Sequence, residues 1–126
     1  MRPSAFLSFP FADNPEWNKE EVKRYANVLW NNGLNPIVPH LNFCFLNEES
    51  DRMEILESCL DLINLTEEFW VCGTNISTGM QYEIDHVLKT KRHLNQLVFY
   101  NDIPVLFSKL EAPITAEKHN ENIDLD

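Results

Sequence analysis

The sequence predicts an α/β fold in which a parallel sheet of four or five strands is covered by helices in a three-layer arrangement. Short apolar runs alternate with segments whose apolar residues recur at helical spacing, in the order β-α-β-α-β-α-β. The connections are short, and strands that alternate with helices in this way pair in parallel through right-handed crossovers. The chain has 126 residues, of which 44% are hydrophobic, so it is long enough for one packed core and one domain.

The first strand and the first helix are predicted near the amino terminus. Ala5–Phe9 is a compact apolar run, and the prolines, Asp and Asn of Pro10–Trp17 indicate a loop at its carboxyl end. Asn18 and Glu21 have the spacing of a capping box, which predicts that a helix begins there. Asn32–Gly33 predicts the end of that helix, because glycine favours the left-handed conformation that commonly terminates helices.

The second strand and the second helix follow. Leu34–Pro39 is predicted to be a short strand, and its two prolines favour an edge of the sheet, because proline cannot donate a hydrogen bond to a neighbouring strand. His40–Ser50 has no clear period and indicates a connecting loop. Asp51 and Glu54 again have capping-box spacing, so the second helix is expected to follow Asp51.

The stretch Gly73–His86 is the centre of the functional prediction. Before it, Phe69–Cys72 is long enough for one buried strand, and within it Met80 and Ile84 begin an amphipathic helix. A strand–loop–helix turn of this kind directs backbone N–H groups and the positive end of the helix dipole at whatever lies above the sheet. Glu83 places one carboxylate near the start of this helix.

The remaining segments complete the sheet. Gln96–Tyr100 is predicted to be the fourth strand, and Pro104–Phe107 would supply a fifth. From about Lys109 onward the chain is polar and acidic, which indicates a frayed or docked tail. We therefore expect an α/β domain at residues 1–108 and an acidic C-terminal tail at residues 109–126.

The charge balance excludes several classes of partner. Lys and Arg total 10 against 20 Asp and Glu, which gives a formal net charge of −10 at pH 7. Nucleic acid polymers and anionic membranes require a cationic footprint, so neither is expected as a partner. No segment approaches the roughly 20 apolar residues of a membrane span, and the N-terminal apolar run is too short for a signal peptide. A cytoplasmic protein is therefore expected.

The motifs predict neither a cofactor nor a metal site. The three cysteines, Cys44, Cys59 and Cys72, are odd in number and contain no CxxC pair, which indicates free thiols. Glu83 and His86 have the spacing of a carboxylate-bridged metal motif, but such sites need this pair twice. The sequence also lacks the glycine-rich motifs of nucleoside triphosphate and dinucleotide sites and the GxSxG motif of serine hydrolases.

The topology predicts where a ligand would bind. In parallel sheets, ligands bind beyond the carboxyl ends of the strands, so the loops after the first three strands should share one crevice. Glu83 is then expected to lie near His40 and Phe11.

Each candidate residue has two interpretations. Glu83 either interacts only with the helix dipole or does chemistry, and Ser77 and Thr78 either cap the helix or hold a phosphate or sugar hydroxyl. Asp61 lies in the middle of a helix, where it is either a solvated flank or a carboxylate aimed at the site. A structural, hydrogen-bonding role is favoured for His40.

Ser77–Ile84, with the sequence Ser-Thr-Gly-Met-Gln-Tyr-Glu-Ile, resembles the nucleophile motif of the nucleoside 2-deoxyribosyltransferase-like superfamily. That superfamily includes deoxynucleoside 5′-monophosphate N-glycosidases. The first strand and its loop, the helix that ends at Gly33, and Pro36–Leu41 are also similar to uncharacterised bacterial and phage relatives, so the resemblance covers roughly residues 5–100. It implies a three-layer α/β/α flavodoxin-like sandwich and a homo-oligomer, commonly a homodimer.

The resemblance also implies retaining chemistry on an N-glycosidic bond. Glu83 would attack the anomeric carbon, and water or a second base would then release the ribosyl group. Six residues before the nucleophile, relatives that act on nucleosides carry Asp and nucleotide hydrolases carry Ser, so Ser77 implies a 5′-monophosphate. The implied catalytic residues are Glu83 and Asp61, and the implied substrate-binding residues are Ser8, Phe11, His40, Ser77, Thr78 and Gly79, with a small-molecule nucleotide or nucleoside as partner.

Three departures from the family pattern keep a second function open. Cys59 stands where relatives carry their second carboxylate, and Asp61 lies about 200° further around the helix. The loop Ser8–Asn14 contains no Arg or Lys to bind a phosphate, and Phe11 stands where relatives often have tyrosine. The alternative function is a non-catalytic module of the same fold that senses or sequesters a nucleotide.

Overall fold

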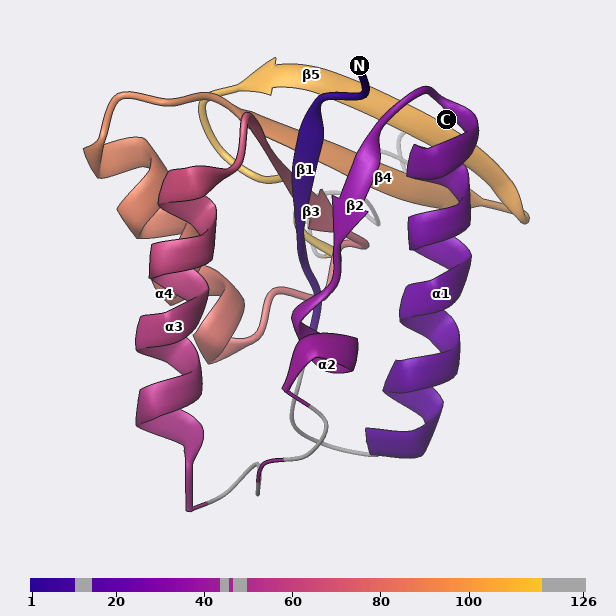
Figure 1. The fold of residues 1–126 in the computed structure, drawn as a ribbon. Coiled ribbons are helices and arrows are strands. Elements are labelled where there is room, and N and C mark those ends of the chain that lie inside the picture. Colours follow the sequence, from indigo (N-terminus) through magenta and orange to yellow (C-terminus); the bar gives the residue numbers. More distant parts are fainter. Residues whose placement is uncertain (11–14, 44–45, 47–49, 117–126) are drawn as a thin grey trace.

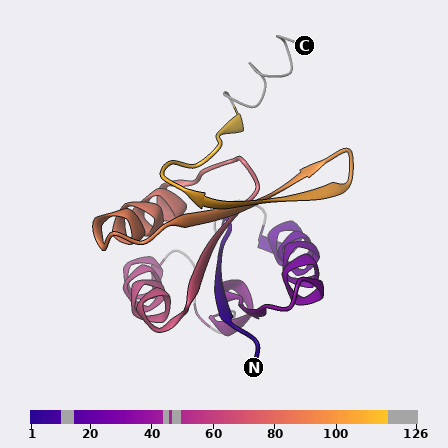
Figure 2. The ribbon, with the colours of Figure 1, turned by 90° about the horizontal axis from the view of Figure 1, so that it is seen from above.

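The computed structural model describes residues 1–10, 15–43, 46 and 50–116, and it shows a five-stranded sheet with helices on both faces (Figure 1). The elements are β1 (Ser4–Ser8), α1 (Pro15–Asn31), β2 (Asn35–Ile37), α2 (Pro39–Asn42), α3 (Arg52–Leu65), β3 (Glu68–Cys72), α4 (Thr78–Lys89), β4 (Leu94–Tyr100) and β5 (Ile103–Leu110). Seen from above, α1 lies on one side of the sheet, and α3 and α4 lie on the other (Figure 2). The predicted three-layer α/β class is confirmed.

The strand order is β2-β1-β3-β4-β5, which is the flavodoxin-like order. The first four strands pair in parallel as predicted, and Phe6 of β1 lies opposite Ile37 of β2 on one side and Phe69 of β3 on the other. β5 instead pairs antiparallel with β4. The reason is a two-residue turn at Asn101 and Asp102, whose φ angles of 50° and 65° are those of a tight hairpin, and such a hairpin joins antiparallel strands.

The two faces of the sheet form two separate hydrophobic cores. Successive side chains of a strand point to opposite faces, so Leu7 of β1 packs with Leu29 of α1, whereas Phe6 packs in the core that contains Ile84 of α4. Phe6 also stacks on Phe69 of β3, with ring centroids 5.8 Å apart. This packing holds α3 and α4 on one face and leaves their amino-terminal ends at the carboxyl edge of the sheet.

The two ends of α1 differ in how well the sequence predicts them. The helix begins at Pro15, so the prediction that it starts at Asn18 is wrong. Proline fits the first helical position because its φ is already helical and its missing N–H needs no partner there. At the other end, Gly33 has a φ of 86°, and the N–H of Leu34 donates to the carbonyl of Leu29, as in a glycine-terminated helix. The predicted end of this helix is confirmed.

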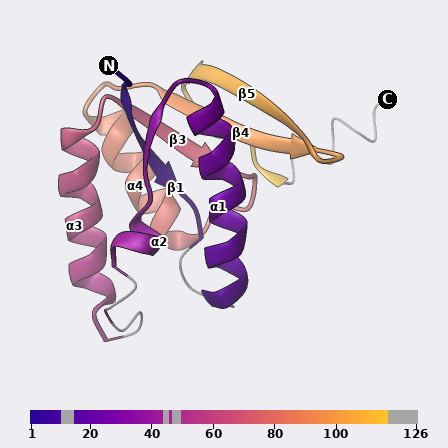
Figure 3. The same ribbon diagram turned by 45° about the vertical axis from the view of Figure 1, so that its right-hand side comes forward.

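The segment between β2 and α3 contains a short helix that the sequence did not indicate. Pro39–Asn42 forms α2, which lies between α1 and α3 in Figure 1 and Figure 3, so the prediction of a continuous loop from His40 is wrong. Pro39 starts this turn for the same reason that proline starts α1. β2 is an edge strand, as Pro36 and Pro39 predicted, although only Pro36 lies within it. Asp51 directly precedes α3 as predicted, but its side chain makes no cap hydrogen bond.

A buried glutamine on β4 connects the segment after β5 to the loop after β3. The side-chain amide of Gln96 donates to the carbonyls of Gly73 and Ile114, each at 2.8 Å, and its oxygen accepts from the N–H of Ile114 at 2.7 Å. The N–H of Ala116 also donates to the carbonyl of Thr74. β5 itself continues to Leu110. The division into a domain at 1–108 and a tail at 109–126 stays a prediction.

None of the helices in the described ranges is long and apolar enough to cross a membrane.

Replacing Gln96 by leucine should destabilise the protein, because leucine leaves the half-buried backbone groups of Gly73 and Ile114 without these hydrogen-bond partners. Each unsatisfied buried group costs about 1–3 kcal/mol, so we expect the free energy of unfolding to fall by about 2–4 kcal/mol in a urea titration followed by circular dichroism. Gln81→Leu, an exposed position on α4, is the matched control and should change it by less than about 0.5 kcal/mol. Equal stability of the two variants would contradict the connecting role of Gln96.

Candidate functional site

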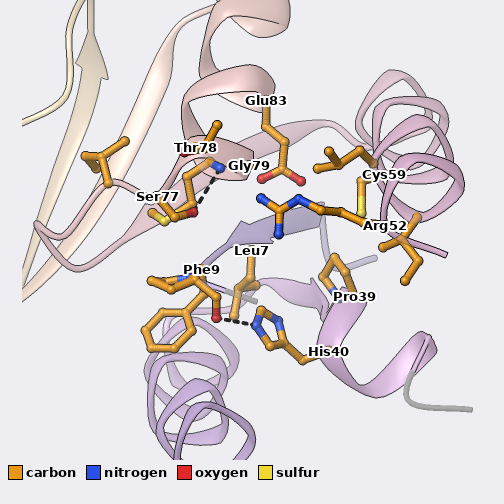
Figure 4. A pocket seen from close by; sticks show the side chains of 15 residues that line it. Leu7, Phe9, Pro39, His40, Arg52, Cys59, Ser77, Thr78, Gly79 and Glu83 are labelled. Carbon is orange, nitrogen blue, oxygen red and sulfur yellow. Dashed lines mark hydrogen bonds between the residues drawn. The ribbon is translucent and has the colours of Figure 1, made fainter. Parts of the chain in front are cut away.

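A cavity of about 320 Å³ lies at the carboxyl ends of β1, β2 and β3 (Figure 4). Open α/β sheets bind ligands at this edge, and the volume is within the range of small-molecule sites. The loops after the first two strands and the β3–α4 connection all contribute to it, so the predicted shared crevice is confirmed for the described residues. Its polar and charged lining side chains are His40, Arg52, Cys59, Ser77, Thr78 and Glu83, and the remaining lining residues are apolar apart from Gly79.

The turn from β3 into α4 depends on one glycine and one cap. Gly73 has a φ of 85°, and a Cβ atom there would lie 3.1 Å from the hydroxyl of Tyr25, so both the backbone and the space require glycine. Ser77 precedes the helix in an extended conformation, and its hydroxyl accepts a hydrogen bond from the N–H of Met80 at 3.2 Å. The predicted capping role of Ser77 is confirmed, and it leaves the amino-terminal end of α4 facing the cavity.

Glu83 lies on the buried face of α4, at 6% exposure, with Met80, Ile84 and Val87. Its Oε1 accepts a hydrogen bond of 2.6 Å from the hydroxyl of Ser8, which is also buried at the end of β1. The carboxyl group therefore points into the protein, whereas a carboxylate that interacts only with the helix dipole would lie in solvent.

Burial raises the pKa of Glu83 from 4.5 to about 7, because the ionised carboxylate loses its hydration. Hydrogen bonds from Ser8 and Cys59 act in the opposite direction and stabilise the ionised form. Burial, together with the negative charge of Glu83, raises the pKa of the Cys59 thiol well above its ordinary value. Cys59 therefore stays a neutral thiol that donates to Glu83, at the position where the family pattern predicts a carboxylate.

His40 forms part of the opposite wall of the cavity. Its Nε2 donates to the carbonyl of Pro10 at 2.7 Å, and its ring packs edge-on against Phe9 with centroids 5.7 Å apart. Burial lowers the pKa of His40, only partly offset by the hydrogen bond to Pro10, so the imidazole is neutral at pH 7. These contacts join the loop after β1 to α2, which agrees with the structural role favoured for His40.

Arg52 is a cavity residue that the sequence reasoning missed. It is the first residue of α3, and its guanidinium group lies among the lining residues between the walls formed by Glu83 and His40 (Figure 4). The loop after β1, where a phosphate-binding cation is expected from the sequence, contains no Arg or Lys. The available signal was the position of Arg52 directly after Asp51, because the amino-terminal end of a helix that follows a parallel strand faces the ligand-binding edge of the sheet.

The structure brings together most of the remaining predicted site residues, but not all of them. Thr78 and Gly79 line the cavity in the first turn of α4, whereas Ser8 lies behind Glu83 and does not line it. Asp61 is exposed on α3 and does not reach the cavity. The helix turns about 200° between Cys59 and Asp61, which directs Asp61 away from the side that faces Glu83. Phe11 is outside the described residues.

The donor set of this site suits an organic ligand better than a metal ion. Glu83 is the single carboxylate among the described lining residues, and no group of three or more His, Cys, Asp and Glu side chains within the described ranges could hold a metal ion. A buried carboxyl with a pKa near 7 can act as a nucleophile or exchange a proton at neutral pH.

Comparisons with known proteins add a family and a fold. A family model described as "Domain of unknown function (DUF7768)" matches residues 3–97, which is most of the chain. No curated protein matches the sequence. A solved structure described as a 2-deoxyribosyltransferase from the psychrotolerant bacterium Bacillus psychrosaccharolyticus is similar at a TM-score of 0.60 and 18% identity, over 79% of this chain and 75% of that one. The fold of this chain is therefore shared with that structure.

The raised pKa of Glu83 makes the stability of the protein depend on pH. Between pH 4.5 and about 7 the folded state keeps a proton that the unfolded state releases, so ionisation favours unfolding as the pH rises. Relative to Glu83→Gln, the wild-type free energy of unfolding should fall by roughly 3 kcal/mol across this range. Urea titrations at several pH values measure it. Glu57→Gln, on the exposed side of α3, should keep the wild-type slope, and the same slope in Glu83→Gln would contradict the assignment.

Proposed function

We propose that this chain, which belongs to the family described as a domain of unknown function (DUF7768), cleaves or transfers the N-glycosidic bond of a (deoxy)nucleoside 5′-monophosphate. Glu83 is the proposed nucleophile. Ser77, Thr78 and Gly79 are the proposed contacts to the phosphate or sugar, and His40 closes the opposite wall.

The observation that carries this proposal is the buried carboxyl of Glu83 in the cavity at the end of β1. A carboxyl group with a pKa of about 7 costs free energy to bury, and the 2.6 Å hydrogen bond from Ser8 holds it in one orientation. Strongly perturbed carboxyl groups in cavities are typical of functional sites. The fold shared with a 2-deoxyribosyltransferase and the Ser77–Ile84 motif favour glycosyl chemistry over other uses of such a group.

The proposed reaction is a double displacement at the anomeric carbon. A carboxylate oxygen of Glu83 forms a bond to C1′ as the bond from C1′ to the base nitrogen breaks, and the electron pair leaves with the base, which takes a proton from solvent. Water or a second base then attacks C1′ from the opposite side and gives up a proton to solvent, and the glycosyl ester bond breaks to restore the carboxylate. The hydrogen bonds from Ser8 and Cys59 favour the ionised carboxylate that the first step requires.

Cys59 favours a second candidate function. Retaining glycosidases use a second carboxyl group as the acid that assists the leaving group, and the described lining of the cavity holds a thiol where that group is expected. A thiol with a raised pKa holds its proton too tightly to be a good acid at pH 7. The second candidate is therefore a module that binds a nucleotide in this cavity without cleaving it.

The wider predictions follow from the first candidate function. A small-molecule nucleotide or nucleoside is the proposed partner, and no cofactor is required by the double displacement. A cytoplasmic location and a homo-oligomeric state stay predictions.

Release of free base is the direct test. The protein is incubated with a panel of ribo- and deoxyribonucleoside 5′-monophosphates, and free base is measured by chromatography. Glu83→Gln keeps the shape of the side chain but removes the nucleophile, so we expect the rate to fall by at least about 10³-fold.

Glu57→Gln removes an exposed carboxylate from α3 and serves as the control, with a rate equal to that of the wild type. Base release that survives Glu83→Gln unchanged would contradict the mechanism. Saturable nucleotide binding with no release by the wild type would favour the binding module.

The pH dependence of kcat should report the ionisation of Glu83. The rate should rise with pH around a midpoint near 7, because the nucleophile must be ionised. Ser8→Ala removes a hydrogen bond that lowers the pKa of Glu83, so the midpoint should move upward by about one unit. Ser108→Ala, at an exposed position on β5, should leave the profile unchanged. A midpoint that moves downward in Ser8→Ala would refute this account of Glu83.

A further inference from the structure

The side chain of Arg52 lies beside the first turn of α4. A Cβ atom built on Gly79 would be 4.0 Å from Arg52 Nη2 and 4.0 Å from the hydroxyl oxygen of Ser77. The guanidinium group and the capping hydroxyl therefore flank the same point of the cavity wall, and Figure 4 shows the guanidinium directed into the cavity. Of the described residues that line the cavity, Arg52 alone carries a permanent positive charge.

Protein stability does not account for a cation at this position. A positive charge in the first turn of a helix opposes the helix dipole. Within the part of the chain that the structure describes, no salt bridge includes Arg52. The charge of Arg52 is not among the causes of the shifted pKa of Glu83, which are burial and the hydrogen bonds from Ser8 and Cys59. A half-buried guanidinium in this setting is available to an anionic ligand.

The first turn of α4 supplies further donors beside Arg52. The N–H groups at the start of a helix have no partner within the helix, and in α4 Thr78 and Gly79 occupy this position in the cavity wall. The hydroxyl of Ser77 already accepts from Met80, which leaves the backbone of the two intervening residues for a ligand. Gly79 has no side chain to cover these groups.

Because the protein is acidic overall, a phosphate dianion needs a local cation in order to bind in the cavity. The chain carries a formal net charge of −10, so a phosphate dianion that approaches the cavity is repelled by the whole molecule. Backbone N–H groups contribute only partial charges. A guanidinium group adds a full charge and a planar pair of donors that matches phosphate oxygens.

The spacing along α4 leaves room for a pentose between this anion site and Glu83. Glu83 lies six positions after Ser77, and a rise of about 1.5 Å per residue puts them about 9 Å apart along the helix axis. A phosphate at the amino-terminal end of α4 would therefore extend its sugar along the helix toward the carboxyl group.

We propose that Arg52 is the residue that selects the 5′-phosphate: together with the backbone N–H groups of Thr78 and Gly79, it makes the cavity favour nucleoside monophosphates over free nucleosides. This assignment rests on the proposed function and names the residue that would determine its substrate class. It requires that removal of Arg52 weakens binding of the nucleotide and leaves binding of the matching nucleoside nearly unchanged.

Isothermal titration calorimetry with deoxynucleoside 5′-monophosphates and the matching deoxynucleosides tests this requirement without relying on turnover. In the Glu83→Gln background, where cleavage does not deplete the ligand, Arg52→Gln should raise the Kd for the monophosphate by roughly 10- to 100-fold and the Kd for the nucleoside by less than about twofold. Arg52→Lys keeps the charge but loses the planar fork, so it should recover part of the affinity. Lys89→Gln removes the same charge from the exposed far end of α4 and is the matched control.

The outcomes separate this inference from the proposed reaction. Arg52-dependent nucleotide binding supports the inference, even where the wild type releases no base and the proposed reaction fails. If Arg52→Gln weakens binding of the monophosphate and the nucleoside equally, or weakens neither, the inference is overturned. Base release that depends on Glu83 would still support the proposed reaction in that case. A loss of nucleotide affinity as large in Lys89→Gln as in Arg52→Gln would also overturn it, because only the overall charge would then matter. Melting temperatures check that each variant is folded.

Discussion

The hydrogen bond from Ser8 to Glu83 is the contact on which the candidate site depends. It joins the end of β1 to the second turn of α4 inside the protein, over 2.6 Å. A carboxyl group without such a partner would be costly at this depth, because burial raises the pKa of Glu83 to about 7 even with hydrogen bonds from Ser8 and Cys59 acting in the opposite direction. The hydrogen bond therefore fixes the orientation of the carboxyl group and limits the cost of its ionisation.

The sheet makes this contact available because it places helix ends around the carboxyl edges of the central strands. Leu7 and Phe6 point to opposite faces of β1, so the strand anchors α1 on one side and the helix pair α3 and α4 on the other. The amino-terminal ends of α3 and α4 then meet at the same edge of the sheet. A carboxyl group, a neutral thiol and a guanidinium group consequently line one cavity, although they come from distant parts of the sequence.

Much of the fold was predictable because its signals are local. Gly33 ends α1 and Ser77 caps α4, as their residue types predicted, and the prolines in and after β2 indicated an edge strand. The failures were also local, but they involved competing signals. Pro15 started α1 in place of the Asn18 capping pattern, and the turn at Asn101 reversed β5. At each position the geometry of a turn or cap residue decided between two structures: a helix start at Pro15 or at Asn18, and a parallel or an antiparallel β5.

The sequence by itself determined most of the elements, their order and the position of Glu83 near the start of a capped helix, because periodicity and capping depend on neighbouring residues. Only the tertiary structure decided which side chains surround Glu83. It brought Cys59 and Arg52 to the cavity, placed Ser8 behind Glu83 and left Asp61 on the exposed side of α3. The angle between two residues on a helix is known from the sequence, but which of them faces the site is not. Packing against the sheet decides which side of α3 faces Glu83.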